Sequence, residues 1–308
     1  MPTTLFIAES AWEFLEKLLP IFRFDEVERT RDYEKAGVWG YGADELKSEA
    51  IVTRALDWMH DRKDKGRFLA WLFHFDVHNW REIETRSIES TAQRFGMEDE
   101  GTLPFRYRVA ARSVDAAFGR LLEGLRELEM EDDVVILFIS DHGEGLGRED
   151  FWLHSIYLWE SLIRVPLVLR APGLPPTVVK QQVGLVDVAP TLARYLHPAP
   201  SMNGYQGEDL VTFLIPDRPK RRLPLLLSST IEQRLSRVGL LDDDYKLILR
   251  ADWDEPQLFD LRLGDPDQVD FGGSASAATI GRMGELLQSP VFVNAYDDAK
   301  AAEARESR

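Results

Sequence analysis

The sequence of 308 residues contains no cysteine. Disulfides, thiolate metal sites and a cysteine-derived nucleophile are therefore excluded, and no redox compartment can be inferred. Basic residues are also scarce, with 37 Lys and Arg against 53 Asp and Glu and a formal net charge of −16. Because nucleic-acid binding needs clustered basic side chains, this balance argues against a nucleic-acid partner. An anionic substrate would have to meet a local positive site.

The sequence also lacks targeting signals. Residues 1–9 have no basic start of the kind found in secretory signal peptides, and Glu13 and Glu16 follow soon after. No run of about 18 apolar residues predicts a membrane span. We therefore expect neither a signal peptide nor a transmembrane segment in this chain. The compartment stays open, because an export signal would lie outside the chain.

Helical and strand patterns alternate along most of the chain, whereas the first forty residues show no clear organisation. This alternation predicts an α/β fold with a parallel sheet covered by helices. After Pro216, short strands separated by turn residues predict a small antiparallel subdomain. We thus expect a core domain at 1–215 and a small C-terminal α+β subdomain and tail at 216–308. The expected strands of the core are 68–75, 134–139 and 165–169, and the expected helices begin near 44, 105 and 187.

Two of these strands end in residues that can carry chemistry. His78 follows the strand at 68–75, and Asp141 and His142 follow the strand at 134–139. Ligands of parallel sheets bind at the carboxyl ends of the strands. A carboxylate and an imidazole before the permissive Gly143 could form half of a divalent metal site. Taken alone, an Asp that caps a turn and a His bonded to a carbonyl explain the pair better.

The residues around this pair resemble sulfatases of the alkaline phosphatase superfamily in their order and spacing. The resemblance covers roughly residues 40–270 and is most specific from 140 to 192. It implies an alkaline phosphatase-like three-layer sandwich with a mostly parallel sheet, beside the C-terminal antiparallel subdomain. The residues that carry it are Asp76-Val77-His78, Ser140 to Gly147, His154, Glu160, Ile163 to Leu167, Pro172-Gly173, Leu185 to Leu192 and Leu258 to Leu261.

The resemblance also implies roles for single residues. Asp141 and His142 would be metal ligands, and His78 and His154 would be catalytic residues facing the transferred group and its leaving oxygen. The cofactor would be a divalent metal, with calcium or manganese favoured over magnesium. A cation neutralises the ester oxygens and activates the nucleophile, while an imidazole can donate a proton to the leaving alcohol. Glu144 would support this arrangement or form a turn, and Glu160 would be structural.

The departures from the family concern its nucleophile. In sulfatases the nucleophile is a modified Cys, a Ser or a Thr, and it precedes the Asp-Pro-His segment together with an adjacent Asp pair. This chain has no cysteine and no such Asp pair after an early strand. Residues 102–106 match the nucleophile pattern loosely, but they follow His78, so we interpret Thr102 as a loop residue. We assign no nucleophile, and we interpret His74 as a core residue and Asp242-Asp243-Asp244 as a turn.

Three functions remain open on this reading. The first is a truncated or split sulfatase-like hydrolase of sulfuric esters, acting on a small-molecule or glycan sulfate ester. The second is a phosphoric-ester hydrolase or phosphotransferase of the same superfamily. The third is a non-catalytic remnant or binding module that lacks the nucleophile. A homo-oligomer or a complementing chain is a further expectation, based on the apolar segment 5–7 and on a sheet edge left uncovered.

Overall fold

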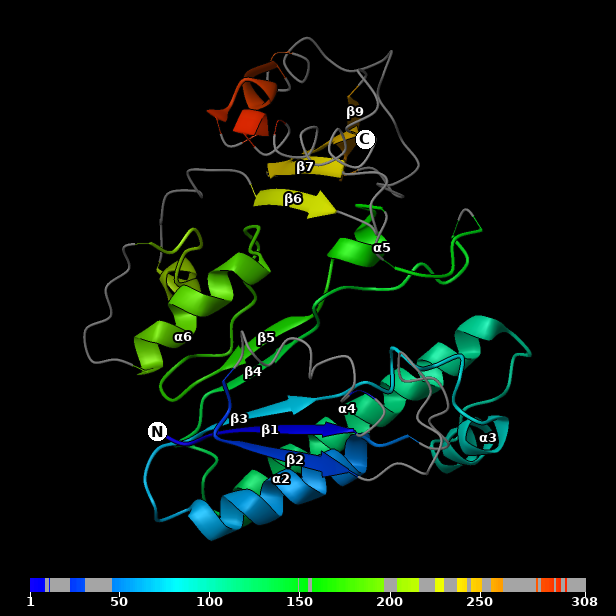
Figure 1. Ribbon diagram of the computed structural model, residues 1–308, viewed down its shortest axis with the longest axis vertical. Coiled ribbons are helices and arrows are strands. Elements are labelled where there is room, and N and C mark those ends of the chain that lie inside the picture. Colours follow the sequence, from blue (N-terminus) through cyan, green and yellow to red (C-terminus); the bar gives the residue numbers. More distant parts are fainter. Residues whose placement is uncertain are drawn as a thin grey trace. The chain divides into compact units, whose positions relative to one another are not determined.

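The computed structural model (Figure 1) divides into two compact units, Met1–Val134 and Val135–Arg308, and each is described by itself. Within them the structure describes residues 1–8, 11, 23–30, 46–148, 150–154, 157–196, 204–215, 225–229, 237–242, 245–250, 256–262, 281, 284–290, 292–294 and 297. No helix in these ranges is long and apolar enough to cross a membrane.

The first unit contains a parallel sheet of three strands in the order β2-β1-β3. The strands are β1 (Thr3–Ala8), β2 (Glu26–Thr30) and β3 (Leu69–Phe73). Helices α2 (Ser48–Arg62) and α4 (Leu103–Glu127) pack against each other beside the sheet, and α3 (Thr85–Arg94) contacts α4 (Figure 1). The predicted strand at 68–75 and the predicted helices near 44 and 105 are therefore confirmed.

The central strand, β1, lies in the region where the sequence showed no clear organisation. Its apolar residues alternate between two cores, as expected for a parallel strand covered on both faces. Phe6 contacts Trp58 of α2 edge to face at 5.7 Å, whereas Leu5 and Ile7 pack with Phe75. All three β1 residues are at most 1% exposed. The apolar side chains of segment 5–7 are thus buried within their own unit, and the segment no longer supports oligomerisation.

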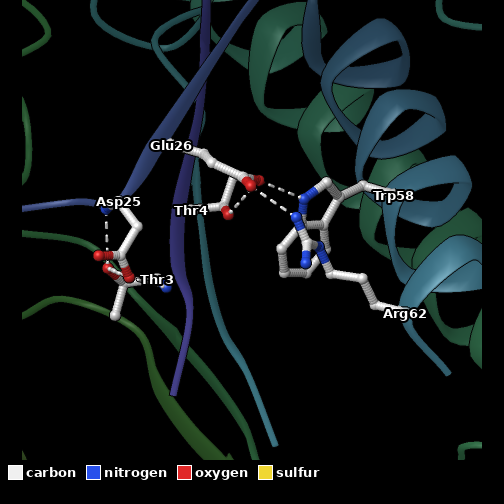
Figure 2. Close-up of polar contacts among 6 residues, drawn as sticks. All are labelled: Thr3, Thr4, Asp25, Glu26, Trp58 and Arg62. Carbon is white, nitrogen blue, oxygen red and sulfur yellow. Dashed lines mark hydrogen bonds and ion pairs between the residues drawn. The ribbon is translucent and has the colours of Figure 1, made fainter. Parts of the chain in front are cut away.

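A carboxylate ties the amino ends of β1 and β2 to the last turn of α2 (Figure 2). Glu26 accepts hydrogen bonds from Trp58 Nε1 at 2.8 Å, Arg62 Nη2 at 2.6 Å and Thr4 Oγ1 at 3.4 Å. The bond from Trp58, followed by that from Arg62, lowers the pKa of Glu26. This network lies at the end of the sheet opposite to the carboxyl ends of its strands, so it stabilises the unit away from the candidate residues.

The second unit begins with a pair of strands, β4 (Ile136–Ile139) and β5 (Leu167–Arg170). They run antiparallel, with Ile136 opposite Arg170. The prediction that both belong to a parallel sheet is wrong for this pair. A parallel neighbour needs a crossover of a dozen or more residues, usually a helix, and among the described residues only the four-residue helix α5 (Glu160–Ile163) lies between them.

A helical segment follows β5. The 3-10 turn η2 (Leu185–Asp187) leads into α6 (Val188–Leu196), and a second 3-10 turn, η3 (Leu210–Leu214), packs against α6. Asp187 is fully buried, and its carboxylate accepts from the backbone N–H groups of Gly184 at 2.8 Å and Glu208 at 2.7 Å. Asp187 therefore closes the turn before α6 and fixes a later loop.

The C-terminal part contains the antiparallel sheet that the sequence predicted, in the order β6-β7-β8-β9. Its strands are β6 (Leu225–Ser229), β7 (Arg237–Asp242), β8 (Tyr245–Arg250) and β9 (Gln257–Asp260). One face packs with Leu286 and Phe292, and the other with Leu158. The domain boundary between 215 and 216 stays a prediction. Asp243, Asp244 and the tail after 297 lie outside the described residues.

Candidate functional site

The first candidate residue, His78, lies in the turn that follows β3. Its backbone N–H donates to Phe75 O at 3.0 Å, and its ring stacks on the Phe75 ring at a centroid distance of 4.2 Å. Its Nδ1 lies 3.2 Å from Asn79 Oδ1. Since the strands of this sheet are parallel, His78 lies at their carboxyl end, where the sequence analysis placed it.

Asp76, two residues earlier, has a different task. Its carboxylate accepts from Lys47 N at 2.9 Å, Ser48 N at 2.9 Å and Ser48 Oγ at 2.6 Å. These donors form the N-terminus of α2, whose first N–H groups have no partner within the helix. A buried carboxylate there satisfies them and interacts favourably with the helix dipole. Asp76 therefore anchors the His78 turn to α2.

Arg106 of α4 anchors the other end of this turn. Its guanidinium donates to the carbonyls of Trp80 at 3.2 Å, Arg81 at 3.4 Å and Ile83. Arg106 belongs to the segment 102–106, which loosely matches the nucleophile pattern. In the structure it binds the backbone of the turn that carries His78. Thr102 is the exposed N-cap residue of α4, which agrees with its interpretation as a residue outside the helix.

His74 lies directly after β3 and is half-buried, with its Nδ1 shielded from solvent, so the interpretation as a core residue holds only in part. Burial lowers its pKa to about 4, because the charged imidazolium would lose its hydration. Its Nδ1 has no hydrogen-bond partner within the part of the chain that the structure describes. His74 is therefore a neutral imidazole at physiological pH.

The second set of candidate residues lies after β4. The Nδ1 of His142 lies 2.8 Å from its neighbour's carbonyl, Gly143 O. A carbonyl can only accept, so Nδ1 carries a hydrogen, and in the neutral imidazole Nε2 then keeps the lone pair. This Nε2 lies 3.8 Å from Asp141 Oδ1, and the Asp141 side chain is 76% exposed. An imidazole nitrogen and a carboxylate oxygen thus face the same space.

Backbone contacts fix the position of this pair. The N–H of Gly143 donates to Leu162 O of α5 at 2.8 Å, and a Cβ at Gly143 would lie only 2.0 Å from Ser161 O. Only glycine permits this close approach. Further along, Gly145 N donates to Leu153 O at 3.0 Å. The loop after β4 therefore folds back on itself and on α5.

This fold-back brings His154 onto His142. Their rings stack at a centroid distance of 4.2 Å with an interplanar angle of 24°. The Nδ1 of His154 lies 3.5 Å from Glu144 Oε2, and the Glu144 side chain is 6% exposed. Three residues predicted from the sequence, Asp141, His142 and His154, thus come together, with the Glu144 carboxylate buried beside them. His78 belongs to the other unit.

The donor set fits part of a divalent metal site. Asp141 Oδ1 and His142 Nε2 are ligand types that calcium, magnesium and manganese accept, and they lie 3.8 Å apart. No group of three or more His, Asp and Glu that could hold an ion occurs among the residues described by the structure. Because hard cations take about six ligands, Asp141 and His142 would be two among several.

Comparisons with known proteins give the family of the chain. A sulfatase family model matches residues 17–198. An arylsulfatase K from Gallus gallus is 30% identical over 263 residues, which cover 82% of this chain and 48% of the relative. A choline-sulfatase from Rhizobium meliloti is 30% identical over 198 residues, which cover 60% of this chain and 37% of the relative.

The fold is shared with solved structures. A protein solved in complex with its substrate D-glucosamine-2-N,6-O-disulfate matches with a TM-score of 0.69 at 15% sequence identity, over 98% of this chain and 81% of that structure. The chain spans less than half the length of the two curated relatives. Since the family model covers more than half of the chain, the chain belongs to the sulfatase family.

Proposed function

We propose that the chain acts as a metal-dependent sulfatase-like hydrolase of sulfuric esters. The observation that carries this proposal is the arrangement after β4, in which His154 stacks on His142 beside Asp141. Family membership supports the reaction class, and the tautomer of His142 supports metal binding through Nε2. We propose an alkaline phosphatase-like sandwich as the arrangement of the core, and calcium or manganese as the metal.

In this proposal each residue of the site has a separate role. Asp141 and His142 would hold the cation, which when bound neutralises ester oxygens and lowers the barrier to attack. His154 donates a proton to the leaving alcohol oxygen, and the buried Glu144 carboxylate, 3.5 Å from its Nδ1, favours the charged form of the ring. His78 contacts the transferred group. We assign no residue as nucleophile, and a truncated or split enzyme stays a prediction.

The proposed substrate is a small-molecule or glycan sulfate ester. Two similar proteins support this class, one a choline-sulfatase and the other solved with a disulfated glucosamine. The net charge of −16 makes a local cation necessary, since the protein as a whole repels an anionic ester.

Phosphoryl transfer is the second candidate function. A carboxylate, an imidazole ligand and a proton-donating imidazole suit a phosphate ester as well as a sulfate ester, because both reactions develop charge on oxygens that a cation can neutralise. A binding module without turnover is the third candidate. The three candidates predict different results in one assay.

That assay measures hydrolysis of p-nitrophenyl sulfate and p-nitrophenyl phosphate by the purified chain, with calcium, manganese or a chelator. We expect sulfate hydrolysis that requires a metal and is lost in Asp141→Ala. Preferential phosphate hydrolysis would favour the second function. Loss of activity in Thr102→Ala would make Thr102 the nucleophile. A folded chain that hydrolyses neither ester would contradict the proposal and favour a binding module.

A further inference from the structure

A buried ion pair connects the C-terminal sheet with α5. Lys246 of β8 is fully buried, and its Nζ lies 3.2 Å from Glu160 Oε1 at the start of α5. The Nζ also lies 5.2 Å from the centre of the Phe259 ring. A buried ammonium costs several kcal/mol in lost hydration unless it is paired. The two residues, 86 positions apart in the sequence, therefore fix each other's location.

Apolar contacts reinforce the same connection. Leu158, two residues before Glu160, packs with Ile248 of β8 and Phe259 of β9, and each is at most 5% exposed. A Cβ at Gly239 of β7 would lie 3.0 Å from Leu158 Cδ1, so the strand and the segment before α5 are in close contact. The guanidinium of Arg237 lies 4.6 Å over the Tyr157 ring. Three strands of the C-terminal sheet thus hold α5 in place.

α5 in turn holds the candidate site. Leu162 O accepts from Gly143 N at 2.8 Å, and Gly143 O lies 2.8 Å from Nδ1 of His142. The path from Lys246 to the His142 ring therefore passes through Glu160, α5 and Gly143. A four-residue helix cannot keep its own position, because helices this short are unstable without tertiary contacts.

We propose that Lys246 is a positioning residue of the candidate site: its ion pair with Glu160 fixes α5, and α5 fixes the backbone that orients His142. The catalytic meaning of this inference rests on the proposed sulfatase function. Its structural meaning does not, since the orientation of a ring can be measured without turnover. The C-terminal sheet then contributes to the candidate site by fixing the orientation of His142.

The test uses nitrogen NMR signals of the histidine rings in the full chain, near pH 8.5, about two units above the ordinary histidine pKa of about 6.5. At this pH a neutral His142 held by Gly143 O shows the signature of the Nδ1–H tautomer. A His142→Gln variant assigns the signal. The tested variants are Lys246→Met, which removes the charge but keeps an unbranched stem, and Lys246→Arg, which keeps the charge.

The matched control is Leu249→Ala on the same strand. Leu249 is buried on the opposite face of the sheet, in the cluster with Leu286 and Phe292, so its truncation weakens the sheet without touching α5. We expect Lys246→Met to lose the single-tautomer signature of His142, and Leu249→Ala and Lys246→Arg to keep it. In a hydrolysis assay, kcat should fall on the order of a hundredfold in Lys246→Met, with a smaller change in KM.

An unchanged His142 signature in folded Lys246→Met would overturn the proposal, and so would an equal loss in Leu249→Ala. If Lys246→Met does not fold, Glu160→Gln decides, because it removes the same ion pair from the less deeply buried partner: a lost signature supports the proposal and a retained one refutes it. If the wild-type chain hydrolyses neither ester, the proposed function fails, and the ring signals still decide the role of Lys246.

Discussion

The loop after β3 and the loop after β4 both carry an Asp and a His at the end of a strand, yet they use them differently. Asp76 is 5% exposed and is bonded to the N-terminus of α2, whereas the Asp141 side chain is 76% exposed. The first Asp therefore stabilises the fold, whereas the second accepts only from its neighbour's backbone, His142 N, among the contacts described, and is our proposed metal ligand. An Asp and a His after a strand therefore do not by themselves indicate a functional site. The hydrogen bonds that the Asp accepts decide whether its role is structural.

The two loops also differ in what fixes them. The loop after β3 is held by neighbours in α2 and α4, through Asp76 and Arg106. The loop after β4 is held by α5, which in turn depends on strands more than seventy residues further along the chain. The first loop can therefore be perturbed locally, whereas the second should respond to changes in the C-terminal sheet.

The largest expected effect is a loss of hydrolytic activity on substitution of Asp141, the aspartate to which we assign no structural role. Asp141→Ala should lower kcat/KM for p-nitrophenyl sulfate at least about a hundredfold, because a bound cation supplies several kcal/mol of transition-state stabilisation. Its free energy of unfolding should change by less than about 0.5 kcal/mol, since the side chain is exposed. Activity assays and urea unfolding measure both. A large loss of stability without loss of activity would reverse the assignment.

The second prediction concerns pH and His74. Burial lowers the pKa of His74 to about 4, below the ordinary value of about 6.5, so protons bind preferentially to the unfolded chain. Its contribution to stability is complete above pH 6.5 and is lost as the pH falls toward 4. Between pH 7 and pH 4.5 this loss amounts to about 2–3 kcal/mol. In urea unfolding, His74→Phe should lack this part of the pH dependence; an identical pH profile would contradict the prediction.

The third prediction tests the structural role of Asp76. Asp76→Ala should lower the free energy of unfolding by about 2 kcal/mol, because the backbone donors of Lys47 and Ser48 lose their acceptor. Asp76→Asn, which keeps one acceptor oxygen, should lose less. Urea unfolding of both variants gives the comparison. An unchanged free energy of unfolding in Asp76→Ala would mean that the hydrogen bonds of Asp76 to α2 do not stabilise the protein.

The smallest effect is expected at the other anchor of the same loop. Arg106→Lys should destabilise the protein by about 1 kcal/mol, because an ammonium cannot reach three carbonyls with the fork geometry of a guanidinium. Thr102→Ala serves as the control on the same helix, since its side chain makes no capping bond. Equal midpoints of unfolding for Arg106→Lys and wild type would argue against the anchor.

The sequence predicted the features that depend on local patterns. The strands β3 and β4, the helices α2 and α4, and the antiparallel C-terminal sheet follow from hydrophobic periodicity and turn residues. The sulfatase resemblance located Asp141, His142 and His154, which the structure brings into one loop. Their chemical roles stay predictions.

Features that depend on distant partners were missed. The antiparallel pairing of β4 and β5 was missed because periodicity reports burial but not strand direction. The capping role of Asp76 depends on donors 28 and 29 residues away, and the position of Glu160 on a lysine 86 residues away. β1 is a short apolar strand and β2 a largely charged one, and neither shows a clear period in the sequence. Only the folded arrangement shows which polar groups are already bonded.

The measurement that tests the central claim most directly is a titration of the chain with Mn²⁺, observed by the histidine ring signals. A paramagnetic ion held by Asp141 and His142 should broaden the ring signals of His142 and His154 first, and Asp141→Ala should abolish this selectivity. Uniform broadening of all rings, or the same selective broadening in Asp141→Ala, would contradict the claim that the loop after β4 is the metal-binding site.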